Sequence, residues 1–257
     1  MMSLKEAIDT RISIRKFNDL PIEIDKLKEV NDLIKQYNEF PGIRFELIND
    51  KNAFSTFTES YGLFENVNTF IVAIRELDSD NSEEKLGYFG ENLVLTAVAN
   101  GLGTCWVGVR DDLIGLDYYD LIPDEYKNKK NPTVTLKDNE EICCLIALGN
   151  IDIEEEELKI LSNKRGSKNY DELTYVTSYA PLEEEWFKNG IKAVLKAPSA
   201  FNMQPIRFVY DKNMVYAEIV NKQATMVDVD LGIAKLHFQI GAECGSWQWG
   251  NQGVFNK

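Results

Sequence analysis

The spacing of apolar residues along the chain predicts a mixture of helices and short strands. Pro21 opens a predicted helix, in which apolar residues recur at every third or fourth position up to Ile34. The runs 69–74 and 142–148 are almost continuously apolar and have the length of buried strands, and residues 45–48 predict a further short strand. This combination of element types indicates an α+β fold.

A helix predicted between Gly87 and Gly103 is apolar on almost every side. A helix without a polar face is expected to pack against other elements on several sides, and Gly101 and Gly103 are typical of a helix C-terminus. Near the N-terminus, Ser3 and Glu6 have the spacing of a capping box and predict a short first helix. We therefore expect the apolar helix to lie at the centre of the fold.

The same order of features starts again from about residue 176. Pro181 precedes a second amphipathic helix, and the sequence IRF at 206–208 then repeats IRF at 43–45. Four further matches are all 142 positions apart: Gly90 with Gly232, Gly103 with Gly245, Thr104 with Ser246, and Gly108 with Gly250. Either these residues match by coincidence or the chain consists of two half-units, 1–170 and 171–257. In the second case the two central helices would pack as if across the twofold axis of a dimer.

The charge balance excludes several classes of partner. The 257 residues include 42 acidic and 28 basic side chains, which gives a formal net charge of -14. Such a charge repels phosphate backbones and anionic membranes, so we expect no nucleic-acid or membrane partner, and an anionic ligand must bind in a local basic pocket. The longest apolar run, 142–148, is too short to span a bilayer, and the N-terminus lacks the apolar core of a signal peptide. We expect a cytoplasmic globular protein.

Side chains for acid-base and nucleophilic chemistry are scarce. The four cysteines include no C-x-x-C pair, so they predict neither a disulfide framework nor a zinc site, and we expect them to be small buried residues. The one histidine, His237, lies in an apolar stretch and is expected to be a hydrogen-bonded helix residue rather than a catalytic base or a metal ligand. This scarcity favours a cofactor that brings its own reactivity.

Two polar segments are candidates for ligand binding. In residues 11–17, RISIRKF, polar and apolar residues alternate. An extended backbone would place Arg11, Ser13 and Arg15 on one side, where guanidinium groups can bind phosphate oxygens in pairs. The loop 196–205, KAPSAFNMQP, follows a predicted helix and consists mainly of small and polar residues, which allows close approach to a flat ligand and hydrogen bonds to its edge.

A third candidate is the basic island at 163–167, NKRGS, which follows an acidic run and is a second candidate phosphate clamp. The segment GLGTCW at 101–106 does not match the glycine-rich fingerprint of dinucleotide-binding proteins. Its third glycine position is Trp106, and it ends a helix where the fingerprint opens one. Taken singly, the three candidates also fit ordinary structural interpretations: a solvent-facing strand, a turn and a charged surface.

Taken together, these segments resemble the FMN-dependent nitroreductase family. RISIRKF is similar to the family's R-x-S-x-R-x-F motif, APSAFNMQP at 197–205 to its A-P-S-x-x-N-x-Q-P loop, and GLGTCWVG at 101–108 to the turn beside the flavin. Ordinary members carry the loop a few tens of residues after the first motif, but residues 36–42 here have no match, and the second half has the loop without the arginine motif. The chain therefore resembles the single-chain subgroup, a fused pseudo-dimer in which each half retains the part that the other half lost.

The resemblance implies a nitroreductase-like α+β fold, with mostly antiparallel central sheets flanked by helices and two half-units forming an internal pseudo-dimer. It also implies one FMN per chain, bound between the halves, so that a monomer would already own a complete site. The phosphate and ribityl end would be held by Arg11, Ser13, Arg15, Lys164 and Arg165. The isoalloxazine would be lined by Pro198, Ser199, Ala200 and Asn202, with an edge hydrogen bond from Gln204, and faced by the backbone of Trp106, Val107 and Gly108.

On this resemblance, the expected function is that of an FMN-dependent NAD(P)H oxidoreductase. It would reduce nitro-compounds, quinones or similar small electron acceptors by ping-pong hydride transfer, with NADH or NADPH as co-substrate and no catalytic side chain of its own. Reductive dehalogenation and oxidative flavin cleavage are further chemistries of the family. Two alternatives are a flavin-binding or flavin-sensing module without turnover and an α+β interaction protein without a cofactor.

Overall fold

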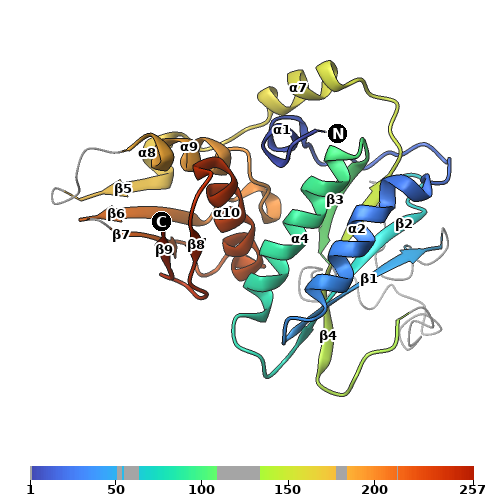
Figure 1. Cartoon of the computed structure of the whole chain (residues 1–257), viewed down its shortest axis with the longest axis horizontal. Coiled ribbons are helices and arrows are strands. Elements are labelled where there is room, and N and C mark those ends of the chain that lie inside the picture. Colours follow the sequence, from blue (N-terminus) through green and yellow to red (C-terminus); the bar gives the residue numbers. More distant parts are fainter. Residues whose placement is uncertain (1, 51–53, 55–63, 109–133, 178–183, 213) are drawn as a thin grey trace.

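Two long helices at the centre of the molecule separate two sheets, one in each half of the chain (Figure 1). The computed structural model describes residues 2–50, 54, 64–108, 134–177, 184–212 and 214–257. The central helices are α4 (Ser82–Ala99) and α10 (Val227–Ala242). The predicted α+β class is therefore confirmed, and the predicted apolar helix lies at the centre of the fold.

The first half is built on a four-stranded antiparallel sheet of order β1-β2-β4-β3. Its strands are β1 (Ile43–Asn49), β2 (Thr69–Glu76), β3 (Gly103–Gly108) and β4 (Glu140–Gly149). Helices α2 (Ile24–Tyr37) and α4 pack on one face, and apolar residues of the N-terminal arm, residues 11–17, pack on the other. Because β2 and β4 are the two central strands and are buried on both faces, they read in the sequence as continuous apolar runs.

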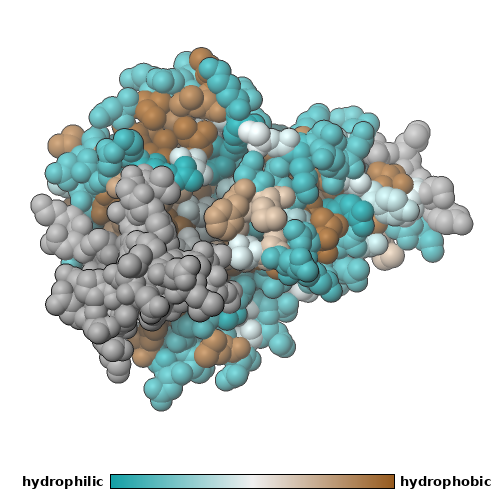
Figure 2. Space-filling model, turned by 180° about the vertical axis from the view of Figure 1, so that it is seen from behind, coloured by the Kyte–Doolittle hydropathy of each residue, from teal (hydrophilic) through white to brown (hydrophobic). Residues whose placement is uncertain are grey.

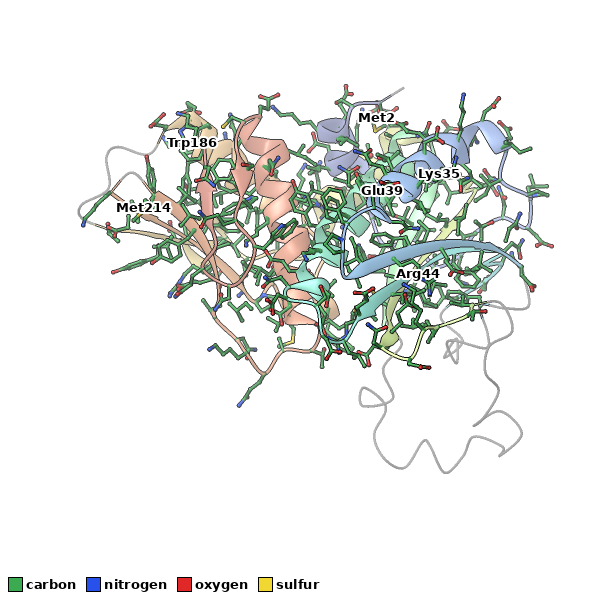
Figure 3. All side chains as sticks on the ribbon, turned by 60° about the horizontal axis from the view of Figure 1, so that its bottom comes forward. Met2, Lys35, Glu39, Arg44, Trp186 and Met214 are labelled. Atoms are coloured by element: carbon green, nitrogen blue, oxygen red, sulfur yellow. The ribbon has the colours of Figure 1, made fainter. Side chains whose placement is uncertain are left out.

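The second half repeats this topology. Its strands β6 (Ile206–Asp211), β7 (Met214–Ile219), β8 (Ser246–Trp247) and β9 (Val254–Asn256) follow the order β6-β7-β9-β8, which corresponds to β1-β2-β4-β3. Helix α9 (Glu185–Val194) takes the place of α2, and α10 takes that of α4. In the second core, the ring of Trp186, a residue labelled in Figure 3, stacks on that of Phe255 with 5.7 Å between centroids. The internal pseudo-dimer implied by the sequence is present.

Short elements complete the fold. The connecting segment contains α7 (Glu155–Lys164), α8 (Tyr170–Leu173) and β5 (Thr174–Val176), and β5 pairs in parallel with the edge strand β6 of the second sheet. Helix α1 (Leu4–Thr10) begins with the predicted capping box of Ser3 and Glu6, which is confirmed, and η2 (Ala200–Asn202) is a single 3-10 turn. The predicted boundary between residues 170 and 171 stays a prediction.

The two central helices cross at a pair of glycines. A Cβ atom on Gly87 would lie 2.0 Å from the carbonyl oxygen of Val229, and a Cβ atom on Gly232 would lie 1.9 Å from that of Glu84. The contact is symmetric. Gly87 and Gly232 are 145 positions apart, and so are the two carbonyl residues, Glu84 and Val229, and the first residues of the two helices. The predicted match of Gly90 with Gly232 is therefore wrong. Helix α4 has 18 residues and α10 has 16, so corresponding residues are fewer positions apart at the C-terminal ends of the helices than at their N-terminal ends.

A buried ion pair joins the two halves and holds the C-terminal segment. Lys235 of α10 donates to the carboxylate of Glu84 on α4 at 2.5 Å, and to the carbonyls of Gln248 and Gly250, both at 2.9 Å. The second oxygen of Glu84 accepts the N–H of Gly250 at 2.5 Å. The description of α4 as apolar on almost every side is thus incomplete, because it carries Glu84 and Glu91 as buried and paired charges.

Three local predictions are corrected. Residues 11–17 form no strand and make only isolated bridges, with Arg11 and Ile14 buried and Ser13 and Arg15 exposed, so the strict alternation fails. The central helix begins at Ser82 instead of near residue 87. Helix α2 begins at residue 24, three positions after the proline that was expected to open it.

The surface agrees with the acidic composition. On the face seen in Figure 2, hydrophilic residues surround separate hydrophobic patches.

Three of the four cysteines are buried, as predicted, and Cys244 is half-buried. None of the helices in the described ranges combines the length and the apolar character needed to cross a membrane.

Candidate functional site

The N-terminal arm runs alongside β3. Ser13 forms a parallel bridge with Thr104, and the N–H of Ile14 donates to the Thr104 carbonyl at 2.8 Å. The arm thereby passes close to the buried thiol of Cys105. Burial raises the pKa of this thiol, and the charges of Arg15 and Arg11 and a hydrogen bond with Ser13 oppose the rise. The structure thus brings these three predicted site residues together without a regular strand.

Two guanidinium groups, those of Arg11 and Arg165, lie next to each other and form what we call the arginine cradle. Arg11 is 4% exposed, and Nη1 of Arg165 donates to the Arg11 carbonyl at 2.8 Å. Within the described ranges, Nε of Arg11 and Nη2 of Arg165 are buried without a hydrogen-bond partner. Burial and the Arg11 charge lower the pKa of Arg165 to about 9, and burial lowers the pKa of Arg11. Because buried like charges with free N–H groups are unfavourable, the cradle favours an anion with several oxygens.

One buried carboxylate lies near the cradle without pairing closely with it. Oε1 of Glu91 on α4 is 3.9 Å from Nε of Arg11, which is beyond hydrogen-bond distance. Its two oxygens instead accept from the indole N–H of Trp106 at 2.7 Å and face Nε2 of His237 at 2.8 Å. The side chain of Trp106 is therefore fixed against the central helix, while β3 ends at the exposed Gly108.

The loop 196–205 of the second half is held by the basic island. The Asn202 amide donates to the Gly166 carbonyl at 2.9 Å, and the Gln204 amide donates to the Ser167 hydroxyl at 3.1 Å. The second and third candidate segments of the sequence therefore form one unit. Because the island spans the C-terminal end of α7 and the residues after it, this unit also carries Arg165 of the cradle.

Backbone strain marks the same loop. Phe201, Asn202 and Gln204 have positive φ angles of 50°, 56° and 47°. Such conformations are costly for residues other than glycine and persist only where surrounding contacts hold them. Asp230 of α10 supplies one such contact, because its Oδ1 accepts the N–H of Ala200 at 2.9 Å.

The arm and the loop meet at Lys196. Nη2 of Arg11 donates to the Lys196 carbonyl at 3.5 Å, and the Lys196 ammonium pairs with Asp9 of α1 at 2.5 Å. Segments from both halves thus adjoin one cradle. The remaining basic candidates, Arg15 and Lys164, are exposed, the latter at the end of α7.

Comparison with protein families identifies the chain. The family model described as "Putative TM nitroreductase" matches residues 3–117 and 124–242. The chain belongs to this TM nitroreductase family. A search of curated proteins found no match. Membership of a nitroreductase family supports an oxidoreductase role.

Several solved structures are similar to this chain. A crystal structure described as "a putative nitroreductase" from Thermotoga maritima is 18% identical with a TM-score of 0.63, over 99% of this chain and 92% of that chain. An FMN-dependent nitroreductase from Clostridium difficile R20291 is 22% identical with a TM-score of 0.45, over 65% of this chain and 93% of that chain. A nitroreductase with bound FMN from Bacteroides fragilis NCTC 9343 is 14% identical with a TM-score of 0.41, over 58% and 89%. The first of these supports the nitroreductase-like fold predicted from the sequence.

Three residues that contact the candidate site are not among those predicted from the sequence. Glu91 and Asp230 are acidic residues inside apolar helices, and a buried carboxylate requires a partner, so this pattern was a usable signal. Lys168 donates to the Gln204 carbonyl from Nζ at 2.8 Å, but nothing in its sequence context distinguishes it from a surface lysine.

Asp230→Asn is expected to remove a pH dependence of folding stability. Desolvation raises the pKa of Asp230 from 3.8 to about 7, and its Oδ2 is buried without a partner in the described part of the chain. Because the raised pKa belongs to the folded state, the unfolded state ionises first, and stability is lost as the pH rises from 3.8 to about 7. Asparagine keeps the acceptor for Ala200, so we expect a gain of about 1–2 kcal/mol at pH 8.

Urea unfolding between pH 4 and pH 8 measures this effect. Asp228→Asn, in the same turn of α10 but exposed, is the matched control and should keep the wild-type pH profile. An Asp230→Asn profile as steep as that of the wild type would contradict the assignment. Asp230 also lines a cavity of about 20 Å³ with Pro198 and Ser199, so the same group borders the loop.

Proposed function

We propose that this protein is an FMN-dependent NAD(P)H oxidoreductase that reduces nitro-compounds, quinones or similar small electron acceptors. The observation that carries the proposal is the arginine cradle, in which Arg11 and Arg165 each keep a buried N–H without a partner within the described ranges. A phosphate monoester carries close to two negative charges and offers oxygens to both groups. It would also oppose the burial and the Arg11 charge that together lower the pKa of Arg165. The residues present therefore fit the phosphate of FMN.

Each segment of the site has its own task in this proposal. The cradle binds the phosphate, and the exposed Ser13, Arg15 and Lys164 bind the phosphate and ribityl end from the solvent side. Loop 196–205 presents small side chains and the Pro198 ring to the flat ring system, and the end of β3 faces it with backbone N–H groups. FMN supplies the hydride chemistry when bound. The protein then needs no general base, in agreement with the burial of its one histidine.

The internal repeat supports one FMN per chain. In the second half, the segment 248–250 corresponds to the end of β3, and in the first half the turn before β1 corresponds to the loop before β6. The repeat therefore defines a twin position of the candidate site, formed by these two segments. At this twin position aromatic rings meet: the centroid of Phe89 lies 5.8 Å from that of Trp249 and 4.7 Å from that of Phe40. The second half also has no arginine motif before its first helix. The twin position is therefore packed with apolar rings where the candidate site presents charge.

Titration of the purified chain with FMN, followed by anaerobic addition of NADH or NADPH, tests the proposal. We expect flavin fluorescence to be quenched with saturation at one FMN per chain, and the visible absorbance of the bound flavin to bleach on addition of at least one of the two nucleotides. Riboflavin, which has no phosphate, is the matched control and should bind far more weakly.

The possible outcomes separate the alternatives. Saturation at two FMN per chain would contradict the single site. Tight binding without bleaching would identify a flavin-binding or flavin-sensing module without turnover. A chain that takes up no FMN would support the interaction protein without a cofactor.

A further inference from the structure

Glu91 lies at the centre of a largely buried polar network. It extends from α4, and its partners come from the N-terminal arm, from β3 and from α10. The α10 partner, His237, also contacts the Ala193 carbonyl of α9 through Nδ1 at 3.0 Å. Glu91 and His237 are both 0% exposed, so their charges must be balanced inside the protein.

The partners of His237 determine how many protons the pair carries. A carbonyl oxygen only accepts, so Nδ1 of His237 carries a proton and donates to Ala193. Nε2 lies 2.8 Å from Oε1 of Glu91, a distance that requires a proton between the two atoms. That proton belongs either to the imidazole, which gives an ion pair, or to the carboxyl, which gives two neutral groups. In both cases the pair has a net charge of zero.

Because the pair has no net charge, Glu91 offsets only part of the positive charge of the arginine cradle. Oε1 of Glu91 is only 3.9 Å from Nε of Arg11, so a free Glu91 carboxylate would be the natural partner of that guanidinium. His237 holds this oxygen at 2.8 Å instead, and Nε of Arg11 keeps its N–H without a partner in the described ranges. The positive charge of the cradle is thereby available to a ligand.

We propose that His237 is a positioning residue for cofactor binding, which keeps the Glu91 carboxylate from neutralising Arg11 and so preserves the cradle for the phosphate of FMN. The inference rests on the proposed function, because it concerns the same phosphate site. Without His237, the Glu91 charge is unpaired and turns to Arg11. Neutralisation of Arg11 by Glu91 then competes with binding of the phosphate to Arg11.

The test measures dissociation constants for FMN and for riboflavin. His237→Phe should raise the FMN dissociation constant at least ten-fold, since a charge-assisted contact contributes about 1.5–3 kcal/mol. Riboflavin affinity should change little, because riboflavin has no phosphate to compete with Glu91. A general defect in the fold would weaken both ligands alike.

A double variant separates charge from packing. His237→Phe/Glu91→Gln removes the competing carboxylate and should bind FMN at least ten-fold more tightly than His237→Phe alone. If His237→Phe does not fold, His237→Leu replaces it. Leucine cannot donate a hydrogen bond to Glu91 and leaves its charge uncompensated, so the same loss and the same rescue by Glu91→Gln are expected.

Three results would overturn the proposal: wild-type FMN affinity in the single His237 variants, loss of affinity that Glu91→Gln fails to rescue, or equal losses for FMN and riboflavin. If the wild-type chain itself does not bind FMN, the proposed function fails and the inference fails with it. The wild-type titration therefore distinguishes the two failures.

Discussion

Replacement of both cradle residues, Arg11→Met/Arg165→Met, is expected to weaken FMN binding by roughly two to four orders of magnitude. Each guanidinium would make a charge-assisted contact of about 1.5–3 kcal/mol with the phosphate, and every 1.4 kcal/mol is about ten-fold in affinity. Arg11→Ala alone should lower the affinity roughly 10- to 150-fold on the same scale. Fluorescence titration with FMN measures both variants.

The folded state without cofactor should tolerate the same double replacement. The buried Arg11 and the half-buried Arg165 each have a buried N–H group without a partner in the described part of the chain, which is unfavourable. Methionine fills most of the volume of each side chain without a charge. We therefore expect the melting temperature of the cofactor-free protein to stay level or rise while FMN affinity falls. Loss of binding accompanied by unfolding would instead assign the two arginines a structural role.

Arg207→Met is the matched control for this experiment. Arg207 lies on the second sheet, where its Nε donates to Glu218 at 2.8 Å, and it belongs to no candidate binding segment. Its replacement should leave FMN affinity unchanged. Wild-type affinity in the double cradle variant would contradict the phosphate site.

Gly232→Ala is expected to destabilise the fold by about 3 kcal/mol or more. The added Cβ would lie 1.9 Å from the Glu84 carbonyl oxygen, and this atom belongs to helix backbone and cannot turn away. The central helices must move apart, which places the effect at or above the upper end of the range for overpacking a core. Thermal unfolding should show a loss of roughly 6–12 °C in melting temperature for a chain of this size.

Pseudo-twofold symmetry makes the prediction sharper. Gly87→Ala meets the Val229 carbonyl at 2.0 Å and should destabilise by a similar amount. Gly166→Ala is the control, since the nearest atom to its added Cβ is 3.8 Å away. Two variants with wild-type stability would show that the helices do not cross at these glycines.

Local patterns predicted the elements better than their relation to one another. The apolar runs of β2 and β4 and the capping box of α1 needed only neighbouring residues. The repeat was visible in glycine spacing, but the pairing of Gly90 with Gly232 was wrong because α4 and α10 differ in length. A constant sequence offset cannot follow such a change, whereas the contact of Gly87 with Val229 locates the helix crossing directly.

The sequence motifs did not reveal which of their side chains are buried. Alternation in the arm suggested that Arg11 and Arg15 would be equivalent, yet the first is buried and the second exposed. The difference arises because the arm is joined to β3 by isolated bridges and is not a regular strand, so successive side chains do not alternate strictly. Likewise, the position of Arg165 beside Arg11 depends on the path of the connecting segment after α7.

The amino-acid sequence by itself determined the α+β class, the two related halves and the short segments that resemble a flavin site, because these depend on periodicity and on the order of motifs. Only the tertiary structure decided that Arg165 lies beside the buried Arg11 and that His237, not Arg11, holds Glu91. The physical reason is that desolvation and charge pairing depend on which groups the fold brings within a few ångströms, and these groups come from residues as far apart as the arm and α10.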